Sequence, residues 1–402
     1  MTAQDRAYDV VVAGAGPAGA ATAHGLAAQG WRVALIDRAR FPRAKACAEY
    51  FSPGVVDCFE RLGLWTAVSQ LPHSRLRGME LVAPGGGRHL LAYPDDTQAH
   101  RALAVRREFL DQALVDQARD AGVAVHLGVT VVDVLRGPAG VAGLVARAGS
   151  ETRAFSARLL IGADGSKSLV GRQAGLEAAS RWPARVGLVT HYSGVDGLED
   201  HGEMHVGRHV YCGLAPLGCG VVNVGLVTSV GRARALGSGE AVLNWALRRL
   251  PAVAGLLENG RRIDRLRGCA PLAHRRLRPH APGLLLVGDA AGFLDPFTGE
   301  GVFRALRGAE LAISVATAAL RSGDVSAGAL APYAHLRRRA FAAKDRLCLL
   351  VQSFVAVPAL LDYAVQRLNR RSEAAQLAAA LGDFASADDV LRPQSLWNLL
   401  RP

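Results

Sequence analysis

The alternation of apolar and polar positions along the first forty residues predicts a strand, a helix and a second strand. A largely apolar run at residues 8–13 precedes a glycine-rich turn, and the small apolar residues of 20–29 have the length of a helix. A second apolar run, at 31–36, has the length of a buried strand. Strand, helix and strand in this order form the β-α-β unit that opens doubly wound α/β sheets.

The turn between this first strand and its helix carries a G-x-G-x-x-G sequence. Gly14 permits a tight turn, Gly16 lets the backbone approach a pyrophosphate, and Gly19 lets the helix pack closely on the strand. Asp37, at the end of the second strand, is placed to accept hydrogen bonds from ribose hydroxyls. The pattern therefore predicts adenine dinucleotide binding. The predicted contacts are Gly14, Ala15, Gly16, Pro17, Ala18, Gly19, Asp37 and Arg38.

The next polar segment, Phe41 to Pro53, is predicted to be a loop. Its charged residues Arg43, Lys45 and Glu49 have the character of a solvated loop with a surface ion pair. Ser52 is a suitable N-cap for a helix that extends through residue 62.

The middle of the chain continues the α/β pattern. An amphipathic helix is predicted at 107–121, followed by strands at 123–127 and 130–135 and a hairpin at 141–155. The apolar run 159–161 then leads to Asp164 and Gly165. Asp164 is therefore expected at the carboxyl edge of the sheet, where doubly wound folds bind ligands.

From residue 181 to 277 short alternating strands and glycine turns predict a second, mainly antiparallel domain, with strands at 186–192, 210–214 and 221–227. A buried strand at 284–287 then ends in Gly288 and Asp289.

A long helix is predicted at 302–320, and its start is flanked by Gly299 and Gly301. Such a helix N-terminus is suited to bind an anion or a carbonyl. The chain from 332 onward is predicted to be helical.

The composition is that of a globular protein and argues against several functional classes. Half of the 402 residues are hydrophobic and 20% are charged, as in an ordinary soluble globular chain. The formal charge of +12 comes from scattered arginines, with only three lysines, so a contiguous nucleic-acid surface is not expected. Six cysteines without a C-x-x-C pair predict neither a metal site nor a disulfide scaffold and fit the cytoplasm.

No targeting or membrane-spanning segment is expected. Asp5 and Asp9 precede and interrupt the first apolar run, which argues against a signal peptide. The apolar stretch 347–361 is broken by polar residues and a proline, which makes it too short for a transmembrane helix. A peripheral membrane contact through the C-terminal helices stays open.

Three motifs in this order, at Gly14, Asp164 and Gly288, resemble the FAD-dependent monooxygenase superfamily of the hydroxybenzoate-hydroxylase fold. The loop spacing F-P-R-x-K-x-C-x-E-x-x-S-P is similar to the geranylgeranyl-reductase-like branch. The resemblance implies a Rossmann-like α/β domain for FAD, an interleaved antiparallel-sheet substrate domain, and C-terminal helices. The corresponding segments are 1–180 and 278–325 for FAD, 181–277 for substrate, and 326–402 for the helices.

The resemblance also implies roles for individual residues. Arg107 would reach the FAD diphosphate and ribityl region, and the Val131 backbone would contact the adenine. Gly301 and Val302 would present N–H groups to the flavin pyrimidine ring. The remaining cofactor contacts implied are Cys47, Ala48, Asp164, Gly165, Gly288, Asp289 and Gly299.

The chain departs from the branch at three positions. Ala48 stands where the branch usually has glycine, which alters a backbone contact to the flavin. Gly213 and Ala215 replace two aromatic residues of the prenyl reductases, which predicts a wider or different pocket.

Two activities follow from the resemblance. The first expectation is a monooxygenase that hydroxylates or epoxidises an aromatic, isoprenoid or polyketide molecule through a flavin C4a-hydroperoxide. The alternative is a geranylgeranyl-type reductase that saturates C=C bonds of a prenyl lipid, and a third is a flavin-free prenyl-binding escort. Both enzymes require a dry pocket over the flavin, expected between the strand domain and the C-terminal helices. The candidate pocket residues are Tyr211, Cys47, Glu49, His191 and Pro296.

Either enzyme needs a source of electrons. NADH or NADPH is expected as the donor, directly or through a separate flavin or ferredoxin reductase. The expected substrate is a hydrophobic small molecule.

Overall fold

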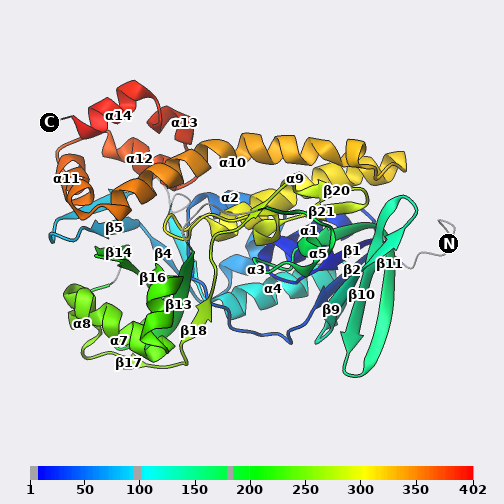
Figure 1. Ribbon diagram of the computed structural model, residues 1–402, viewed down its shortest axis with the longest axis horizontal. Helices are drawn as coiled ribbons and strands as arrows, with labels where there is room; N and C mark the ends of the chain where they lie inside the picture. The colour runs from blue at the N-terminus through cyan, green and yellow to red at the C-terminus, as the bar shows by residue number, and fades with distance from the viewer. Residues whose placement is uncertain (1–7, 94–100, 179–183, 199, 402) are drawn as a thin grey trace.

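The first layer of the protein is an eight-stranded sheet, drawn at the right of Figure 1. The structure is a computed structural model, and it describes residues 8–93, 101–178, 184–198 and 200–401. The parallel strands run in the spatial order β21 (Leu284–Leu286), β11 (Glu151–Gly162), β1 (Tyr8–Ala13), β2 (Val33–Asp37) and β8 (Ala124–Leu127). Antiparallel partners extend it: β20 (His280–Ala281), β10 (Gly140–Ala148) and β9 (Thr130–Gly137).

Both faces of this sheet are buried, which explains the continuous apolar runs in its parallel strands. Val10 and Val12 of β1 point to one face, where α1 (Pro17–Ala27), α4 (Arg107–Asp120) and α9 (Gly301–Ser322) pack. Val11 and Ala13 point to the other face and contact the long β9 to β11 hairpins. The predicted strand, glycine turn and helix are therefore confirmed, with the helix beginning at Pro17.

The second sheet is mainly antiparallel. Its order is β17 (Arg261–Arg262), β13 (Arg185–Ser193), β16 (Val221–Ser229), β15 (Val210–Pro216), β14 (Gly202–Gly207), β5 (Gly78–Val82) and β6 (Arg88–Ala92), with β18 (Arg267–Cys269) beside β13. The helices α6 (Val230–Leu236), α7 (Gly239–Arg249) and α8 (Pro251–Leu257) contribute to a separate core with it.

The division into segments predicted from the sequence differs from this sheet in one respect. Strands β5 and β6 fall in the predicted first FAD segment, yet β5 pairs in parallel with β14 of the second sheet. The predicted boundary at 180/181 lies outside the described residues.

Short elements connect the two sheets. They are the strands β3 (Tyr50–Phe51), β7 (Ala102–Val105), β4 (His73–Leu76), β12 (Glu177–Ala178) and β19 (Arg275–Arg276), the helices α2 (Gly54–Arg61), α3 (Trp65–Ser69) and α5 (Leu169–Gln173), and the 3₁₀ turn η3 (Gly288–Ala291). The prediction that Ser52 caps α2 is wrong. Its hydroxyl instead donates a hydrogen bond to the buried Asp383 carboxylate, because the C-terminal helices fold back onto this segment.

The C-terminal part of the chain is helical: its first helix lies along α9 and β20, and the later helices gather beside β6 of the second sheet (Figure 1). The helices are α10 (Ala327–Ala356), α11 (Pro358–Leu368), α12 (Ala374–Leu381), α13 (Ala387–Val390) and α14 (Pro393–Leu400). Lys344 on α10 lies 2.6 Å from Asp383 and donates to the carbonyl of Ala380, which fastens α10 to the end of α12.

Among the described residues, no single helix has both the length and the apolar composition of a membrane span. Helices α10 and α11 meet those criteria only as a pair, bent by 113° at their break. Leu349, Val357 and Leu360 are exposed near this bend. The peripheral membrane contact stays a prediction.

Candidate functional site

The glycine turn after β1 has the shape of a pyrophosphate cradle. Gly14 has a φ of +100°, and a Cβ there would lie 2.4 Å from the Ala163 carbonyl oxygen. A Cβ on Gly19 would lie 1.8 Å from the Gly14 carbonyl oxygen, so both positions require glycine. Gly16 faces open space, since the nearest atom to a Cβ there is Arg43 Nη2 at 3.8 Å. The loop thus has room for a pyrophosphate, and the cofactor predicted from the sequence fits it.

The adenosine end of the predicted site lies at the edge of the sheet. The Asp37 carboxylate accepts hydrogen bonds from the Ala15 N–H at 2.8 Å and the Ala39 N–H at 2.7 Å. These bonds fix the carboxylate beside the glycine turn and leave lone pairs for ribose hydroxyls. Arg38 is exposed next to it, and Val131 lies on β9, so their cofactor contacts stay predictions.

One cavity, here called the cofactor cavity, brings together most of the residues predicted to bind FAD. The predicted residues that line it are Gly16, Pro17, Ala18, Cys47, Ala48, Arg107, Gly165, Gly288, Asp289, Pro296, Gly299, Gly301 and Val302. Those that reasoning from the sequence missed are Lys45, Ala46, Tyr50, Phe51, Ala163, Ser166, Cys269, Leu272, Phe293 and Ala305. Glycine and charge patterns in the sequence identified the predicted residues. Most of the others belong to no motif that would mark them as cofactor contacts.

The N-terminus of α9 faces this cavity. The helix begins at Gly301, and Glu300 before it makes no capping hydrogen bond with its side chain. Gly301 and Val302 line the cavity, so the N–H groups of the first turn are placed to meet a ligand there. The positive end of the helix dipole would stabilise negative charge on that ligand.

Arg107, Asp111 and Arg43 form an ionic cluster at the wall of the cofactor cavity, which Arg107 lines. Arg107 binds the Asp111 carboxylate with Nε and Nη2, each at 2.8 Å, and Arg43 Nη1 lies 3.1 Å from the same carboxylate. Burial lowers the pKa of Arg107, but Asp111 outweighs this and leaves it raised, so the group stays charged. Arg43, interpreted from the sequence as part of a solvated loop, instead lies against Gly16 and is suited to bind a phosphate.

Asp164 lies beneath the glycine turn. Its Oδ2 accepts a hydrogen bond from the Val170 N–H at 3.1 Å, while its Oδ1 is buried and has no hydrogen-bond partner in the described part of the chain. Burial raises the pKa of this carboxyl. Because buried acceptors are normally hydrogen-bonded, Asp164 Oδ1 is suited to accept a hydrogen bond from a hydroxyl group of a bound cofactor.

Glu49 and His191 lie behind the cavity wall and do not line it. Glu49 is buried with a φ of +56°, and its Oε1 accepts a hydrogen bond from the Arg107 N–H at 2.7 Å. Its Oε2 accepts bonds from His191 Nε2 at 2.6 Å and Asn223 Nδ2 at 3.0 Å. Asn223 also donates to the Cys47 carbonyl at 2.9 Å. These contacts give Glu49 and His191 the geometry of positioning residues for the loop that carries Cys47 and Ala48.

The charge on His191 follows from its two carboxylate neighbours. Burial lowers the pKa of the imidazole, but hydrogen bonds to Glu49 and Asp264 outweigh it and raise that pKa above its usual range. Burial raises the pKa of Asp264, yet His191, Arg267 and Thr190 lower it to about 2. With a carboxylate on each side, both ring nitrogens act as donors and His191 is charged near neutral pH.

Tyr211 lies close to the cofactor cavity but does not line it. Its hydroxyl donates to Asp295 Oδ1 at 2.7 Å, and its ring packs edge-on against Phe297 with centroids 5.1 Å apart. Burial raises the pKa of Tyr211 well above its usual value. Tyr211 therefore supports the segment before Pro296, which does line the cofactor cavity.

A second cavity, here called the apolar cavity, adjoins the first. Ala48, Tyr50, Pro296 and Gly299 line both cavities. The other walls come mainly from the second sheet and the C-terminal helices: Met79, Leu81, Leu91, Tyr93, Met204, Gly213, Leu214, Ala215, Phe297, Thr298, Val351, Leu368, Leu377 and Leu381. No charged side chain in the described ranges lines it. An apolar cavity is therefore present between the strand domain and the C-terminal helices, where the sequence predicted a pocket, and its dryness stays a prediction.

Comparison with known proteins assigns the chain to a family. A family model described as an FAD binding domain matches residues 7–205. The digeranylgeranylglycerophospholipid reductase of Methanothrix thermoacetophila is 30% identical over 333 residues, which cover 81% of this chain and 81% of the relative. The chain belongs to the geranylgeranyl-reductase-like branch of the FAD-dependent oxidoreductases.

Two further similarities agree with this membership. Digeranylgeranylglycerophospholipid reductase 2 of Methanothermobacter thermautotrophicus is 32% identical over 336 residues, which cover 81% of this chain and 82% of the relative. The crystal structure of a geranylgeranyl bacteriochlorophyll reductase-like protein from Thermoplasma acidophilum matches the fold with a TM-score of 0.82 at 24% identity. That match covers 96% of this chain and 98% of the other.

Membership of this family corrects the activity expected first from the sequence. The monooxygenase is the wrong choice, because relatives that span four fifths of the chain are named as reductases. The match to an FAD binding domain also argues against a flavin-free escort. This geranylgeranyl-reductase-like protein is an FAD-dependent oxidoreductase.

Proposed function

We propose that the protein reduces carbon-carbon double bonds in the prenyl chain of a lipid. The observation that carries the proposal is the apolar cavity, which shares part of its wall with the cofactor cavity. Relatives named for digeranylgeranylglycerophospholipid support a prenyl lipid as the substrate class.

The lining of the apolar cavity suits a hydrocarbon chain. Its polar side chains are the hydroxyl groups of Tyr50, Tyr93 and Thr298, and the rest are apolar. Each methylene that leaves water for such a cavity contributes about 0.8 kcal/mol, so a few isoprene units supply ample binding energy. At Gly213 the prenyl reductases have an aromatic residue. Here Met204 occupies the adjacent space, since its Cε would lie 3.3 Å from a Cβ at Gly213, and its side chain keeps this part of the cavity apolar.

Reduced FAD, when bound, supplies a hydride to one carbon of the double bond. The chain supplies the anion-stabilising N–H groups at the start of α9, and the Arg43, Arg107 and Asp111 cluster is placed to hold the cofactor. Addition of a hydride to one alkene carbon requires a proton at the other, and the two together add H₂ across the bond.

Tyr50 is the ionisable residue that lines both cavities. Its hydroxyl lies 2.9 Å from the Tyr93 hydroxyl, which also lines the apolar cavity. We assign the proton transfer to the Tyr50 hydroxyl, which then takes a proton from Tyr93, and a proton from water restores the Tyr93 hydroxyl when the product leaves. Burial raises the pKa of Tyr50 well above its usual value, so the hydroxyl keeps its proton until the reaction.

An anaerobic single-turnover experiment tests this function. FAD-loaded protein is reduced with dithionite, excess dithionite is removed, and a geranylgeranyl glycerophospholipid is added in detergent micelles. We expect the yellow absorbance of oxidised flavin to return and the lipid to gain two hydrogens per double bond. Flavin that stays reduced, with the lipid unchanged, would refute the function.

Two variants test the role of Tyr50. Tyr50→Phe should slow the return of oxidised flavin by about 100-fold or more, the usual contribution of a general acid, with FAD affinity unchanged. Tyr192→Phe, on β13 and outside both cavities, is the matched control and should react at the wild-type rate. Equal rates for both variants would exclude Tyr50 as the proton donor.

A further inference from the structure

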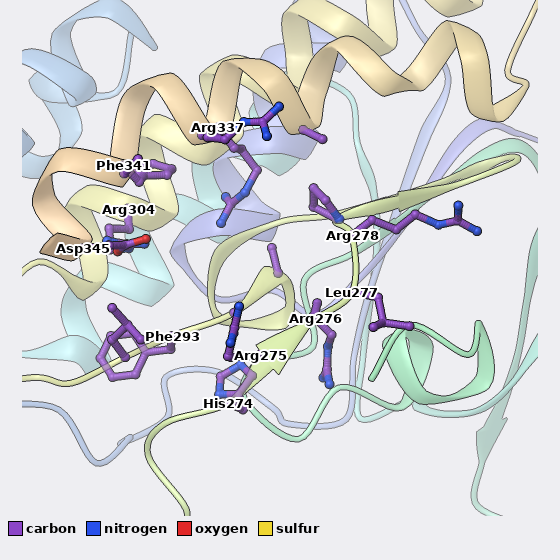
Figure 2. A pocket seen from close by; sticks show the side chains of 17 residues that line it. His274, Arg275, Arg276, Leu277, Arg278, Phe293, Arg304, Arg337, Phe341 and Asp345 are labelled. Carbon is purple, nitrogen blue, oxygen red and sulfur yellow. The ribbon is translucent and has the colours of Figure 1, made fainter. Parts of the chain in front are cut away.

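A pocket rich in arginine (Figure 2) adjoins the cofactor cavity at Phe293. We call it the arginine pocket. Its walls are residues 274–279 around β19, residues 291–294 after η3, Arg304 on α9, and one face of α10 between Ala334 and Asp345. Six arginines line it: Arg275, Arg276, Arg278, Arg304, Arg337 and Arg338.

The positive charge of the arginine pocket is largely uncompensated. The lining holds six arginines and one carboxylate, that of Asp345, which amounts to a formal charge of 6 − 1 = +5. Two of the arginines are paired: Arg304 lies 2.7 Å from Asp345, and Arg276 lies 3.5 Å from Glu177. The other four make no ion pair with any residue in the described part of the chain. Such a concentration of guanidinium groups in a concave site favours a ligand with several negative charges.

The Arg337 side chain is packed between α10 and α9, since a Cβ at Gly308 of α9 would lie 3.0 Å from its Nη1. Its guanidinium lies over the ring of Phe341, with 5.1 Å between Cζ and the ring centroid. Its Nη1 is buried and has no hydrogen-bond acceptor in the described part of the chain.

The position of the arginine pocket connects it to the cofactor. Phe293 lines both this pocket and the cofactor cavity, and its backbone bonds reciprocally with that of His274 at 3.0 and 3.1 Å. Phe293 therefore lies between the two sites. The pocket shares no lining residue with the apolar cavity, so a lipid whose chain fills that cavity does not continue into it.

We propose that the arginine pocket binds the phosphates of a 2′-phosphorylated adenine dinucleotide, the class of NADPH. Arginine forks match phosphate oxygens, and the rings of Phe293 and His274 offer surfaces for the adenine. This deepens the proposed reductase function and rests on it, because the nucleotide would be its electron donor. The reaction balances as NADPH + H⁺ + FAD giving NADP⁺ + FADH₂, with two electrons and one proton transferred as hydride.

Binding of a nucleotide that cannot donate electrons tests the proposal without turnover. Calorimetric titration of the FAD-loaded protein with 2′,5′-ADP should give saturable binding that weakens as salt is raised. Arg338→Ala and Arg275→Ala should each weaken this binding about ten-fold or more, as expected for loss of a hydrogen bond to a charged group. Arg339→Ala is the matched control, because Arg339 is the next residue on α10, is exposed, and does not line the pocket. The Arg339→Ala variant should bind 2′,5′-ADP as tightly as the wild type.

A kinetic measurement distinguishes this proposal from the reductase function itself. Arg338→Ala should lower the second-order rate of flavin reduction by NADPH about ten-fold, while dithionite-reduced protein should still reduce the prenyl lipid at the wild-type rate. If the wild type fails to reduce lipid with dithionite but binds 2′,5′-ADP through these arginines, the reductase function fails and the nucleotide site stands.

Three results would overturn the nucleotide site. One is the absence of 2′,5′-ADP binding to the wild type, and another is equal binding by Arg338→Ala and Arg339→Ala. The third is binding of glycerol 1-phosphate or inorganic phosphate at least as tight as that of 2′,5′-ADP, which would assign the pocket to a lipid headgroup or a free anion.

Discussion

Glu49 offers the sharpest test of how this protein positions its cofactor loop. The carboxylate accepts three hydrogen bonds, from the Arg107 N–H at 2.7 Å, His191 Nε2 at 2.6 Å and Asn223 Nδ2 at 3.0 Å. All three partners are donors, and the site is buried. Glu49→Gln keeps the shape of the side chain but turns an NH₂ group toward at least one of these donors.

The cost of this substitution follows from those contacts. A hydrogen bond to a charged group contributes about 1.5 to 3 kcal/mol, and an opposed donor adds a desolvation penalty. The left-handed backbone of Glu49 also loses part of the bonding that holds it. We therefore expect Glu49→Gln to lower the free energy of unfolding by about 2 to 4 kcal/mol. It should also weaken FAD binding, because the loop it fixes carries Cys47 and Ala48 of the cofactor cavity.

Urea unfolding followed by circular dichroism measures the stability, and flavin fluorescence titration measures the FAD affinity. Glu108→Gln is the control, since Glu108 pairs with Arg106 at the surface and its loss should cost no more than about 0.5 kcal/mol. A Glu49→Gln protein with wild-type stability and FAD affinity but impaired turnover would refute the positioning role and make Glu49 catalytic.

Two further predictions concern the neighbouring network and the substrate cavity. The pKa of His191 is raised above 6.5 in the folded protein, so its ion pairs stabilise the fold fully below pH 6.5 and are lost as pH rises through the raised pKa. The stability advantage of wild type over His191→Gln should therefore shrink with rising pH in thermal unfolding series, and parallel profiles would contradict this. Gly213→Phe should place a ring in the apolar cavity beside Met204 and raise the KM for a geranylgeranyl lipid about ten-fold, with FAD affinity unchanged. An unchanged KM in steady-state assays would remove Gly213 from the substrate site.

Local sequence patterns were sufficient for the elements that hold the cofactor. The glycine turn, Asp37 and the helix start at Gly301 are each specified by residues near one another in the chain, because backbone geometry and helix ends impose short-range requirements. The β-α-β unit and the strand pattern of the second domain were predictable for the same reason.

The features that sequence reasoning missed depend on contacts between distant segments. Arg43 looked like a solvated loop residue, yet it lies against Gly16 and pairs with Asp111. Glu49 and His191 are 142 positions apart and meet only because the second sheet packs behind the loop. The pairing of β5 with β14 likewise has no local signal, since it joins strands from separate segments of the chain.

The sequence alone favoured the wrong reaction, a monooxygenase in place of a reductase, for a physical reason. Monooxygenases and reductases of this fold share the cofactor loop, the aspartate motifs and the helix start, because both must hold the same flavin. The difference lies in the pocket over the ring. Loss of aromatic residues at Gly213 and Ala215 favoured the wrong choice, although the cavity they line remains apolar.

Isotope labelling of the product distinguishes reduction of the lipid from its oxygenation. The FAD-loaded protein is reduced with dithionite in deuterated buffer, mixed with geranylgeranyl glycerophospholipid under ¹⁸O₂, and the lipid mass is recorded. We expect a lipid that gains hydrogen isotope at each reduced double bond and no labelled oxygen. Gain of one ¹⁸O atom without saturation would contradict it and restore the monooxygenase.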